Sequence, residues 1–320
     1  MSKAELRECA EIALGECLNL SRNEQLLILC DPPCYTIGSA FRDIGVKRCK
    51  EAVMVQISPR KEHGNEPPMP VDQWLSQFDV AVLPTSKSLT NTRARMAACR
   101  KGTRIASLPG ITEEVFIRTM KTDWKRLGRY TRSIAARLSS VKKIQITSEA
   151  GTDLVFETGG RHAKADDGAI TSKGASGNLP AGKACLAPLE GTAEGKIVFE
   201  GSFSLIGPLN KPFALQVKSG KICRVFEHEC SNYLRRIFNK YGGDARTIAE
   251  FGIGTLDTAT VSGNILEDEK AKGTAHVALG DNISIGGNVN VPIHLGGMIL
   301  GPTVRLDGRV WMEKGTIIGG

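Results

Sequence analysis

The first part of the chain alternates short apolar runs with helical patterns. Near the start, Leu6, Cys9, Ala13 and Cys17 recur at the spacing of an amphipathic helix. Apolar runs of the kind found in buried parallel strands follow at residues 25–30, 52–57, 80–83 and 104–106. Helical patterns such as residues 92–100 separate these runs. The alternation predicts a doubly wound, mostly parallel sheet with helices on both faces.

The pattern changes after a helix predicted over residues 122–138. Short segments with alternating apolar and polar positions now lie between glycine turns, at residues 143–147, 153–157, 196–200, 213–217 and 222–226. A period of two between turns indicates antiparallel sheet. A single helix with Leu234 and Phe238 on one face interrupts the segments and ends at Gly242. We therefore predict an N-terminal α/β domain over residues 1–138 and a mainly antiparallel, β-rich α+β domain over residues 139–320 that carries the site.

Composition places the chain among soluble globular proteins, with 41% hydrophobic and 24% charged residues in 320. No apolar run approaches the roughly 18 residues that a membrane span needs, and the N-terminus resembles a helix start rather than a signal peptide. The nine cysteines are scattered and odd in number, which does not suit a disulfide framework. We expect a cytoplasmic protein with reduced core thiols, Cys30 and Cys34 included.

The net charge of +8 raises the question of an acidic partner. Lysine and arginine are spread along the chain, and only 5% of residues are aromatic, so no basic stripe alternates with stacking platforms. We predict no nucleic-acid partner and no membrane partner. A small acidic molecule accounts for the charge equally well.

Candidate chemistry is concentrated late in the chain. His276 and His294, two of only five histidines, each lie in a short apolar run followed by glycines. A strand fixes the direction of such an imidazole, and the glycines let a ligand approach. Glu250 lies upstream in equally apolar company. Because an unpartnered buried carboxylate is unfavourable, Glu250 should have a cation, a donor or a metal beside it.

Motifs along nearly the whole chain resemble one protein family. They occur in the order found in the aminopeptidase T/S metallopeptidases. In chain length and motif sequence, the resemblance is closer to the relatives of these peptidases that include 2,5-dihydroxypyridine 5,6-dioxygenase. The matching segments are residues 85–95, 104–112, 151–153, 177–182, 187–188, 249–254 and 263–282. The resemblance implies a two-domain homodimer that holds divalent metal in its C-terminal domain.

The resemblance also assigns metal ligands, residue by residue. Glu250, His276 and His294 fall on ligand positions of the family, whereas two other positions depart from it. Lys183 stands where the family has a glutamate, and Gly296 stands where it has the aspartate of a His-x-Asp motif. An ammonium at that place repels a cation about 4 Å away by roughly 4 kcal/mol per unit charge at an effective dielectric of 20. The sequence therefore argues against a two-metal peptidase site.

Three hypotheses remain for this altered site. In the first, Glu250, His276 and His294 hold one Fe(II) or Zn(II). In the second, no metal binds, and the Lys183 ammonium takes its place, paired with Glu250 and with Asp153 or Glu269. Lys183 could then act as an amine nucleophile, because burial lowers the pKa of lysine. In the third, the pocket binds a ligand or partner and catalyses nothing.

Other charged residues are secondary candidates. Arg161 and His162 could contact an anionic substrate, although loop charges are usually only solvated, and Glu269 could line the pocket floor. The acidic segment 267–270 otherwise has the pattern of a solvated turn. The function that these residues favour is an enzyme acting on a small acidic or amide-containing compound, with Lys183 and Glu250 as catalytic residues. The alternative is a catalytically inactive family member that binds a ligand or partner.

Overall fold

The computed structural model describes residues 2–204 and 206–319. Its contacts divide the chain into two compact units, one made of Met1–Gly128 with Gly168–Ala181, the other of Arg129–Asp167 with Gly182–Gly320. The first division falls within helix α6 (Trp124–Ser139). The domain boundary predicted near residue 138 stays a prediction. It places residues 168–181 in the second domain, whereas in the structure they pack in the first unit.

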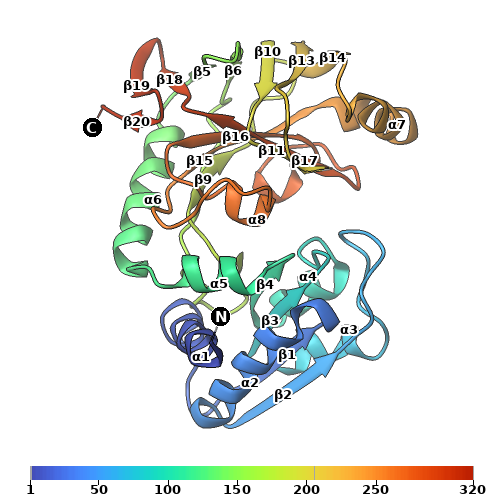
Figure 1. Ribbon diagram of the computed structural model, residues 1–320, viewed down its shortest axis with the longest axis vertical. Helices are drawn as coiled ribbons and strands as arrows, with labels where there is room; N and C mark the ends of the chain where they lie inside the picture. The colour runs from blue at the N-terminus through green and yellow to red at the C-terminus, as the bar shows by residue number, and fades with distance from the viewer. Residues whose placement is uncertain (1, 205, 320) are drawn as a thin grey trace. The chain divides into compact units, whose positions relative to one another are not determined.

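The first unit is built around a five-stranded parallel sheet of order β2-β1-β3-β4-β8, of which Figure 1 labels β1 to β4. Its strands are β1 (Gln25–Cys30), β2 (Glu51–Gln56), β3 (Val80–Thr85), β4 (Arg104–Pro109) and β8 (Ser176–Asn178). Its helices are α1 (Lys3–Ile12), α2 (Tyr35–Arg48), α3 (Val71–Trp74), α4 (Arg93–Arg100) and α5 (Glu113–Met120). The predicted alternation of strands and helices is confirmed.

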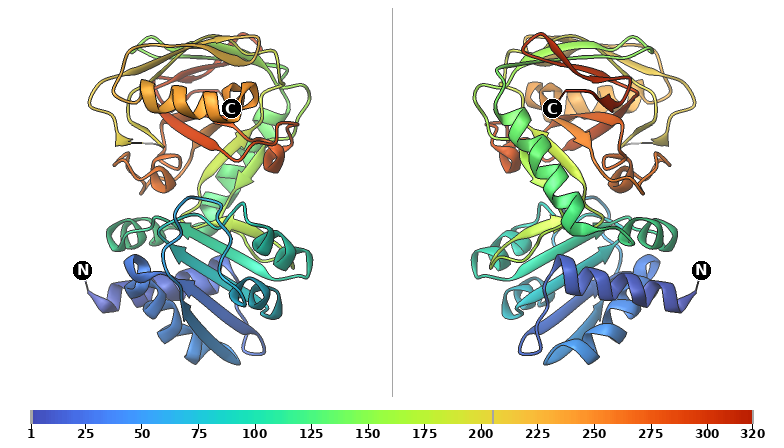
Figure 2. Two further views of the ribbon diagram at one scale, coloured as in Figure 1. Left: turned by 90° about the vertical axis from the view of Figure 1, so that its right-hand side faces the viewer. Right: turned by 90° about the vertical axis from the view of Figure 1, so that its left-hand side faces the viewer.

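Helices cover both faces of this sheet. On one face, α2 packs against β1 and β2, with α1 on α2 (Figure 2). A Cβ at Gly45 would lie 2.8 Å from Leu26 Cδ2, so a glycine lets α2 approach the strand closely. On the other face, Leu27 and Leu29 of β1 share a hydrophobic core with Ala98 of α4. Two covered faces account for the fully apolar strands, because neither side of a strand meets water.

The second unit contains two antiparallel sheets. The first has the order β14-β13-β10-β6-β5-β18-β19-β20 and the second β12-β11-β17-β16-β15-β9-β7. Strands of the first are β5 (Lys143–Thr147), β6 (Asp153–Glu157), β10 (Glu194–Phe199), β13 (Phe213–Lys218), β14 (Lys221–Val225), β18 (Thr303–Leu306), β19 (Arg309–Glu313) and β20 (Thr316–Ile317). Strands of the second are β7 (Lys164–Asp166), β9 (Lys183–Leu186), β11 (Ser202–Phe203), β12 (Gly207–Pro208), β15 (Ile248–Gly254), β16 (Thr274–Gly280) and β17 (His294–Leu300). The helices α7 (Ser231–Tyr241) and α8 (Ile265–Asp268) complete the unit.

One hydrophobic core joins these two antiparallel sheets. It includes Phe156 of β6 and Phe251 of β15, whose ring centroids lie 5.5 Å apart. The predicted mainly antiparallel fold of this part of the chain is therefore confirmed. All nine cysteines are free thiols, and six of them, Cys30 and Cys34 included, are buried. No helix within residues 2–204 and 206–319 combines the length and apolarity needed to cross a membrane.

Candidate functional site

The centre of the candidate site is Glu250, on strand β15 of the seven-stranded sheet, which lies between β16 and β9. A register shift lies between Ile248 and Glu250 in the pairing of β15 with β16. Beyond it, Phe251 and Ile253 join the hydrophobic core, so the alternation of the strand directs Glu250 to the opposite face. Glu250 is 3% exposed, and a carboxylate this buried requires compensating partners.

Two glycines on the same face of β15 make room for those partners. A Cβ at Gly252 would lie 2.5 Å from Nε2 of His276. A Cβ at Gly254 would lie 2.0 Å from the carbonyl oxygen of Ala271, so this glycine makes room for the backbone that follows Lys270. Real Cβ atoms do not approach other heavy atoms so closely, so side chains at these positions would displace the site. The motif that predicts a buried carboxylate thus also provides the space around it.

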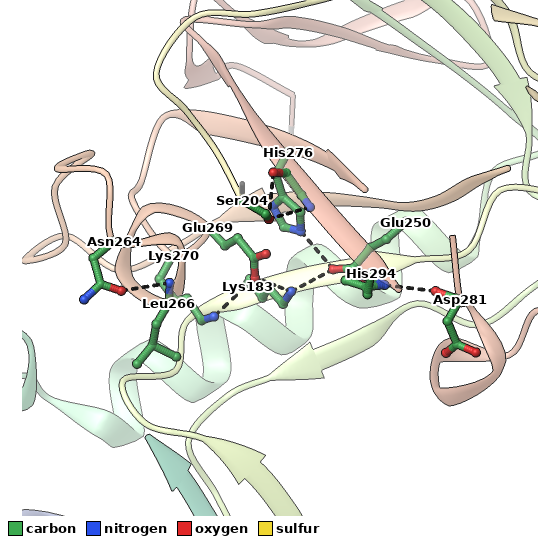
Figure 3. Close-up of polar contacts among 11 residues, drawn as sticks. Lys183, Ser204, Glu250, Asn264, Leu266, Glu269, Lys270, His276, Asp281 and His294 are labelled. Atoms are coloured by element: carbon green, nitrogen blue, oxygen red, sulfur yellow. Dashed lines mark hydrogen bonds and ion pairs between the residues drawn. The ribbon is translucent and has the colours of Figure 1, made fainter. Parts of the chain in front are cut away.

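Both predicted histidines reach Glu250 from the two strands beyond β15. His276 lies opposite Gly252 on β16, and its Nε2 is 2.9 Å from Glu250 Oε1. His294 begins β17, and its Nε2 is 3.3 Å from Glu250 Oε2. The Nδ1 of His294 lies 2.9 Å from the carbonyl oxygen of Asp281, to which it donates (Figure 3). The Nδ1 of His276 is buried and has no hydrogen-bond partner among the described residues.

Lys183 approaches Glu250 from β9, on the other side of β15. Its backbone is paired with Gly254, and its Nζ is 2.7 Å from Glu250 Oε1. The same Nζ is 2.7 Å from Glu269 Oε2, so the ammonium bridges two carboxylates (Figure 3). Asp153, the other partner considered from the sequence, instead accepts a hydrogen bond from Gln145 on the eight-stranded sheet. The side chain of Lys183 is 12% exposed.

The acidic segment after Asn264 is buried, which corrects the prediction of a solvated turn. Lys270 is fully buried, and its Nζ lies 3.4 Å from Glu269 Oε2. Asp268 accepts hydrogen bonds from Ser202 Oγ at 2.5 Å and from the Ser262 amide at 2.8 Å. Tertiary contacts of this kind are invisible to a local sequence pattern, which shows only a run of charges.

The electrostatics of the cluster keep Lys183 charged. Burial acts to lower its pKa, but Glu250 and Glu269 outweigh burial and hold the pKa well above its ordinary value. The pKa of Glu250 is correspondingly well below its ordinary range: burial opposes this shift, and Lys183, His276 and His294 outweigh burial. The expectation that burial lowers the pKa of Lys183 is therefore wrong. An amine nucleophile, which needs a free lone pair, has no support in this arrangement.

The pKa values of the two histidines are shifted in opposite directions. Burial and the Lys183 charge lower the pKa of His276, so its imidazole stays neutral. The pKa of His294 is raised, because its contact with Glu250 outweighs burial. His294 is also the most accessible member of the cluster, with 31% of its side chain exposed. It is thus the group through which the cluster can exchange a proton with a bound molecule.

Asp166 was not among the residues predicted from the sequence. This residue lies on β7, and its backbone is paired with that of Lys183. Burial raises the pKa of Asp166 to about 6, with Lys270 and Lys183 opposing the rise. Its only sequence signal is the position of a short polar strand before the Lys183 segment, which is too weak to distinguish it from the neighbouring Asp167.

The resemblance implies a divalent metal, and the residues present do not fit one. Nε2 of each imidazole is already engaged with Glu250, and the Lys183 ammonium lies 2.7 Å from the same carboxylate. A doubly charged ion about 4 Å from an ammonium is repelled by about 8 kcal/mol at an effective dielectric of 20. Within residues 2–204 and 206–319, no group of three or more His, Cys, Asp or Glu side chains is arranged to hold a metal ion.

Arg161 and His162, the predicted substrate contacts, are not brought into the cluster. Arg161 donates from Nη2 to Glu190 Oε2 at 2.5 Å and from Nη1 to the Pro188 carbonyl at 2.6 Å. His162 is exposed. A substrate role for these two residues stays a prediction. The other five predicted residues do converge: Lys183, Glu250, Glu269, His276 and His294.

Together, the fold and the cluster define a two-unit α/β protein whose antiparallel unit gathers ammonium, carboxylate and imidazole groups on one sheet. A family model described as NicX, 2,5-dihydroxypyridine 5,6-dioxygenase, matches residues 23–319. The chain belongs to this family. The resemblance read from the sequence motifs is confirmed, and the family name is that of an enzyme. Among curated proteins the comparison finds no match.

Two solved structures share the fold. One is 2,5-dihydroxypyridine dioxygenase from Pseudomonas putida KT2440, with a TM-score of 0.84, 18% identity, and coverage of 100% of this chain and 99% of that one. The other is AmpT from Thermus thermophilus, with a TM-score of 0.75, 18% identity, and coverage of 99% and 100%. At these identities the two structures establish the fold class alone.

Proposed function

We propose that this chain is an enzyme that acts on a small acidic or amide-containing compound, with His294 exchanging a proton with that compound. The observation that carries the proposal is the position of His294, whose Nε2 lies 3.3 Å from Glu250 Oε2 while 31% of its side chain is exposed. The other members of the cluster are less accessible. Membership of a family named for an enzyme supports catalysis over binding alone.

The geometry suggests a role for each residue. The Asp281 carbonyl accepts from Nδ1 and fixes the ring, so the proton that His294 exchanges is the one on Nε2, which lies 3.3 Å from Glu250 Oε2 before the compound binds. Glu250 stabilises the imidazolium, which can give its proton to a substrate oxygen or nitrogen and regain one from water. Lys183 keeps its charge and offers a fixed positive group to a substrate carboxylate or carbonyl oxygen. None of these steps uses a divalent metal.

The proposal also includes the partners and compartment expected from the sequence. These are a small-molecule substrate, no nucleic acid, a homodimer carried over from the resemblance, and a cytoplasmic location. Light scattering of the purified protein measures the assembly, and a monomer would count against the homodimer.

The test is turnover of a compound panel by the wild-type chain and two histidine variants. The panel contains 2,5-dihydroxypyridine, small dicarboxylic acid monoamides and amino acid amides, followed by oxygen uptake and ammonia release. For any substrate found, we expect His294→Gln to lower kcat/KM by about 100-fold or more. His63→Gln is the control, because His63 lies in the first unit, where its Nδ1 accepts from the Ser88 amide.

The pH profile gives a second readout. Because the pKa of His294 is raised, turnover that needs the imidazolium should persist below that pKa and fall as pH rises through it. This limb should be absent in His294→Gln. Equal kcat/KM in wild type and His294→Gln would contradict the proposed role, and a chain that binds but turns over nothing would favour the inactive alternative.

A further inference from the structure

Four side chains of types that commonly ligate metals form one cluster with an ammonium in the second unit. Glu250 and Glu269 each lie 2.7 Å from Lys183 Nζ. His276 and His294 lie 2.9 Å and 3.3 Å from the two oxygens of Glu250. Two carboxylates and two imidazoles are a donor set that suits Zn(II) or Fe(II) when they converge on a shared point. Here a lysine ammonium, that of Lys183, lies between the two carboxylates.

We infer that the Lys183 ammonium occupies the position of a metal cation in this donor set. It prevents divalent metal from binding there and supplies the positive charge of the site. Its Nζ meets two carboxylates, so the pair of negative charges is already balanced by Lys183 together with the adjacent Lys270. An incoming metal ion would have to displace the ammonium and would meet its repulsion. The 12% exposure of Lys183 leaves the charge within reach of a small anionic group.

Gly296 is part of the same arrangement. A Cβ at this position would lie 3.1 Å from Glu269 Oε1, closer than most real Cβ contacts. Two hydrogen bonds fix its backbone on β17. The Gly296 amide donates to Ser204 Oγ at 2.8 Å, and Ser204 Oγ donates to the Gly296 carbonyl at 2.9 Å. A larger side chain at 296 would therefore push the Glu269 carboxylate away from Lys183. Lys183 and Gly296 therefore act together, because Glu269, which contacts Lys183, fills the space that a side chain at 296 would need.

This inference deepens the proposed function, because it names the source of positive charge at the same site. Its readout is metal binding rather than turnover, so the two can fail separately. A catalytic chain that binds metal at this cluster would overturn the inference and leave the role of His294 open to its own test. Conversely, a chain without activity in which Lys183 excludes metal would overturn the proposed function and leave this inference in place.

The experiment compares tag-free wild type, Lys183→Gln and Lys183→Arg. Each protein is incubated with Zn(II), freed of unbound metal by gel filtration, and measured by elemental analysis and by isothermal titration calorimetry. Lys183→Gln should gain one Zn(II) per chain over wild type, with an affinity about 100-fold or more tighter, because one repelling charge is gone. Lys183→Arg keeps the charge and should match wild type.

A double variant assigns the gained ion to this cluster. Lys183→Gln combined with His276→Gln should lose the additional Zn(II), whereas nonspecific binding to the free thiols would persist in it. Zn(II) should also raise the melting temperature of Lys183→Gln but not that of wild type, since a ligand that binds only the native state stabilises it. If Lys183→Gln folds poorly alone, refolding with Zn(II) should restore it.

Three results would overturn the inference. The first is one tightly bound Zn(II) per wild-type chain that His276→Gln removes. The second is a folded Lys183→Gln protein with no more metal than wild type. The third is a Lys183→Gln protein that stays unfolded with and without Zn(II).

Discussion

Gly252 lies beside the imidazole of His276, and Gly296 lies beside the carboxylate of Glu269. Neither glycine has a positive φ, so space rather than backbone conformation explains the residue type. The cationic and imidazole groups of the cluster each lie within hydrogen-bonding distance of Glu250 or Glu269. These groups are Lys183, Lys270, His276 and His294. At the scale of single residues, the site depends as much on missing side chains as on the charged ones.

Replacing Gly252 by alanine tests this dependence on space. The new methyl group would collide with the imidazole of His276, which is fully buried and cannot move aside freely. We expect Gly252→Ala to lower the free energy of unfolding by about 3 kcal/mol, as overpacking of a core does. Urea denaturation measures the loss. Gly243→Ala is the control, because its nearest neighbour is the flexible Lys221 Nζ at 3.5 Å, and a similar loss there would contradict the explanation.

Outside the cluster, the carboxylate of Glu190 connects several segments of the second unit through one ion pair and two hydrogen bonds. Glu190, in the segment after β9, accepts from Arg161 Nη2 at 2.5 Å, from Asn282 Nδ2 at 2.8 Å and from the Asn288 amide at 3.0 Å. These bonds connect the loop after β9 with the loop between β16 and β17, which leads to His294. Arg161, expected from the sequence to meet a substrate, thus has a structural partner that local pattern could not reveal.

The pH dependence of Glu190→Gln tests this connection. Burial acts to raise the pKa of Glu190, but the bonds from Arg161, Asn288 and Asn282 outweigh it and lower the pKa from 4.5 to about 2. A depressed carboxyl pKa stabilises the fold above the unfolded value of 4.5, and this contribution is lost as pH falls toward 2. We expect Glu190→Gln to lower the free energy of unfolding by about 2 kcal/mol at pH 7. Denaturation at pH 7 and pH 3 should show a smaller difference at pH 3, and an equal difference at both would contradict the assignment.

Some elements were predictable from sequence and others were not. Runs such as residues 25–30 and 80–83 are apolar throughout because they are covered on both faces, so their pattern alone indicates buried parallel strands. The convergence of Lys183, Glu250, His276 and His294 followed from the family motifs. The burial of Lys270 and the position of Asp166 did not, because both depend on distant strands. The three-residue strand β8 has no hydrophobic pattern, and only its pairing with β4 makes it a strand.

At the scale of the whole molecule, the chain passes between its two units more than once. Residues Gly168–Ala181 belong to the first unit although they follow strands of the second. Within this segment, β8 pairs with β4 in parallel register, from Ile105 opposite Ser176 to Ser107 opposite Asn178. The parallel sheet is therefore completed by residues that a single cut in the sequence would remove.

A fragment experiment measures the contribution of that segment. Residues 1–138 alone lack β8 and leave the outer edge of β4 unpaired, so we expect a broad, poorly cooperative unfolding transition. Residues 1–128 joined to residues 168–181 by a flexible glycine-serine linker restore the strand and should unfold cooperatively. Circular dichroism during urea denaturation compares the two. A cooperative transition of equal midpoint in both fragments would show that β8 is dispensable.

The central claim is that the Lys183 ammonium occupies the cation position between Glu250 and Glu269. A crystal structure of the wild-type protein soaked in Zn(II), with data collected on both sides of the zinc absorption edge, tests it directly. We expect Lys183 Nζ in hydrogen-bonding contact with both carboxylates and no anomalous peak among Glu250, His276 and His294. An anomalous peak bound by those three side chains, with Lys183 turned away, would contradict it.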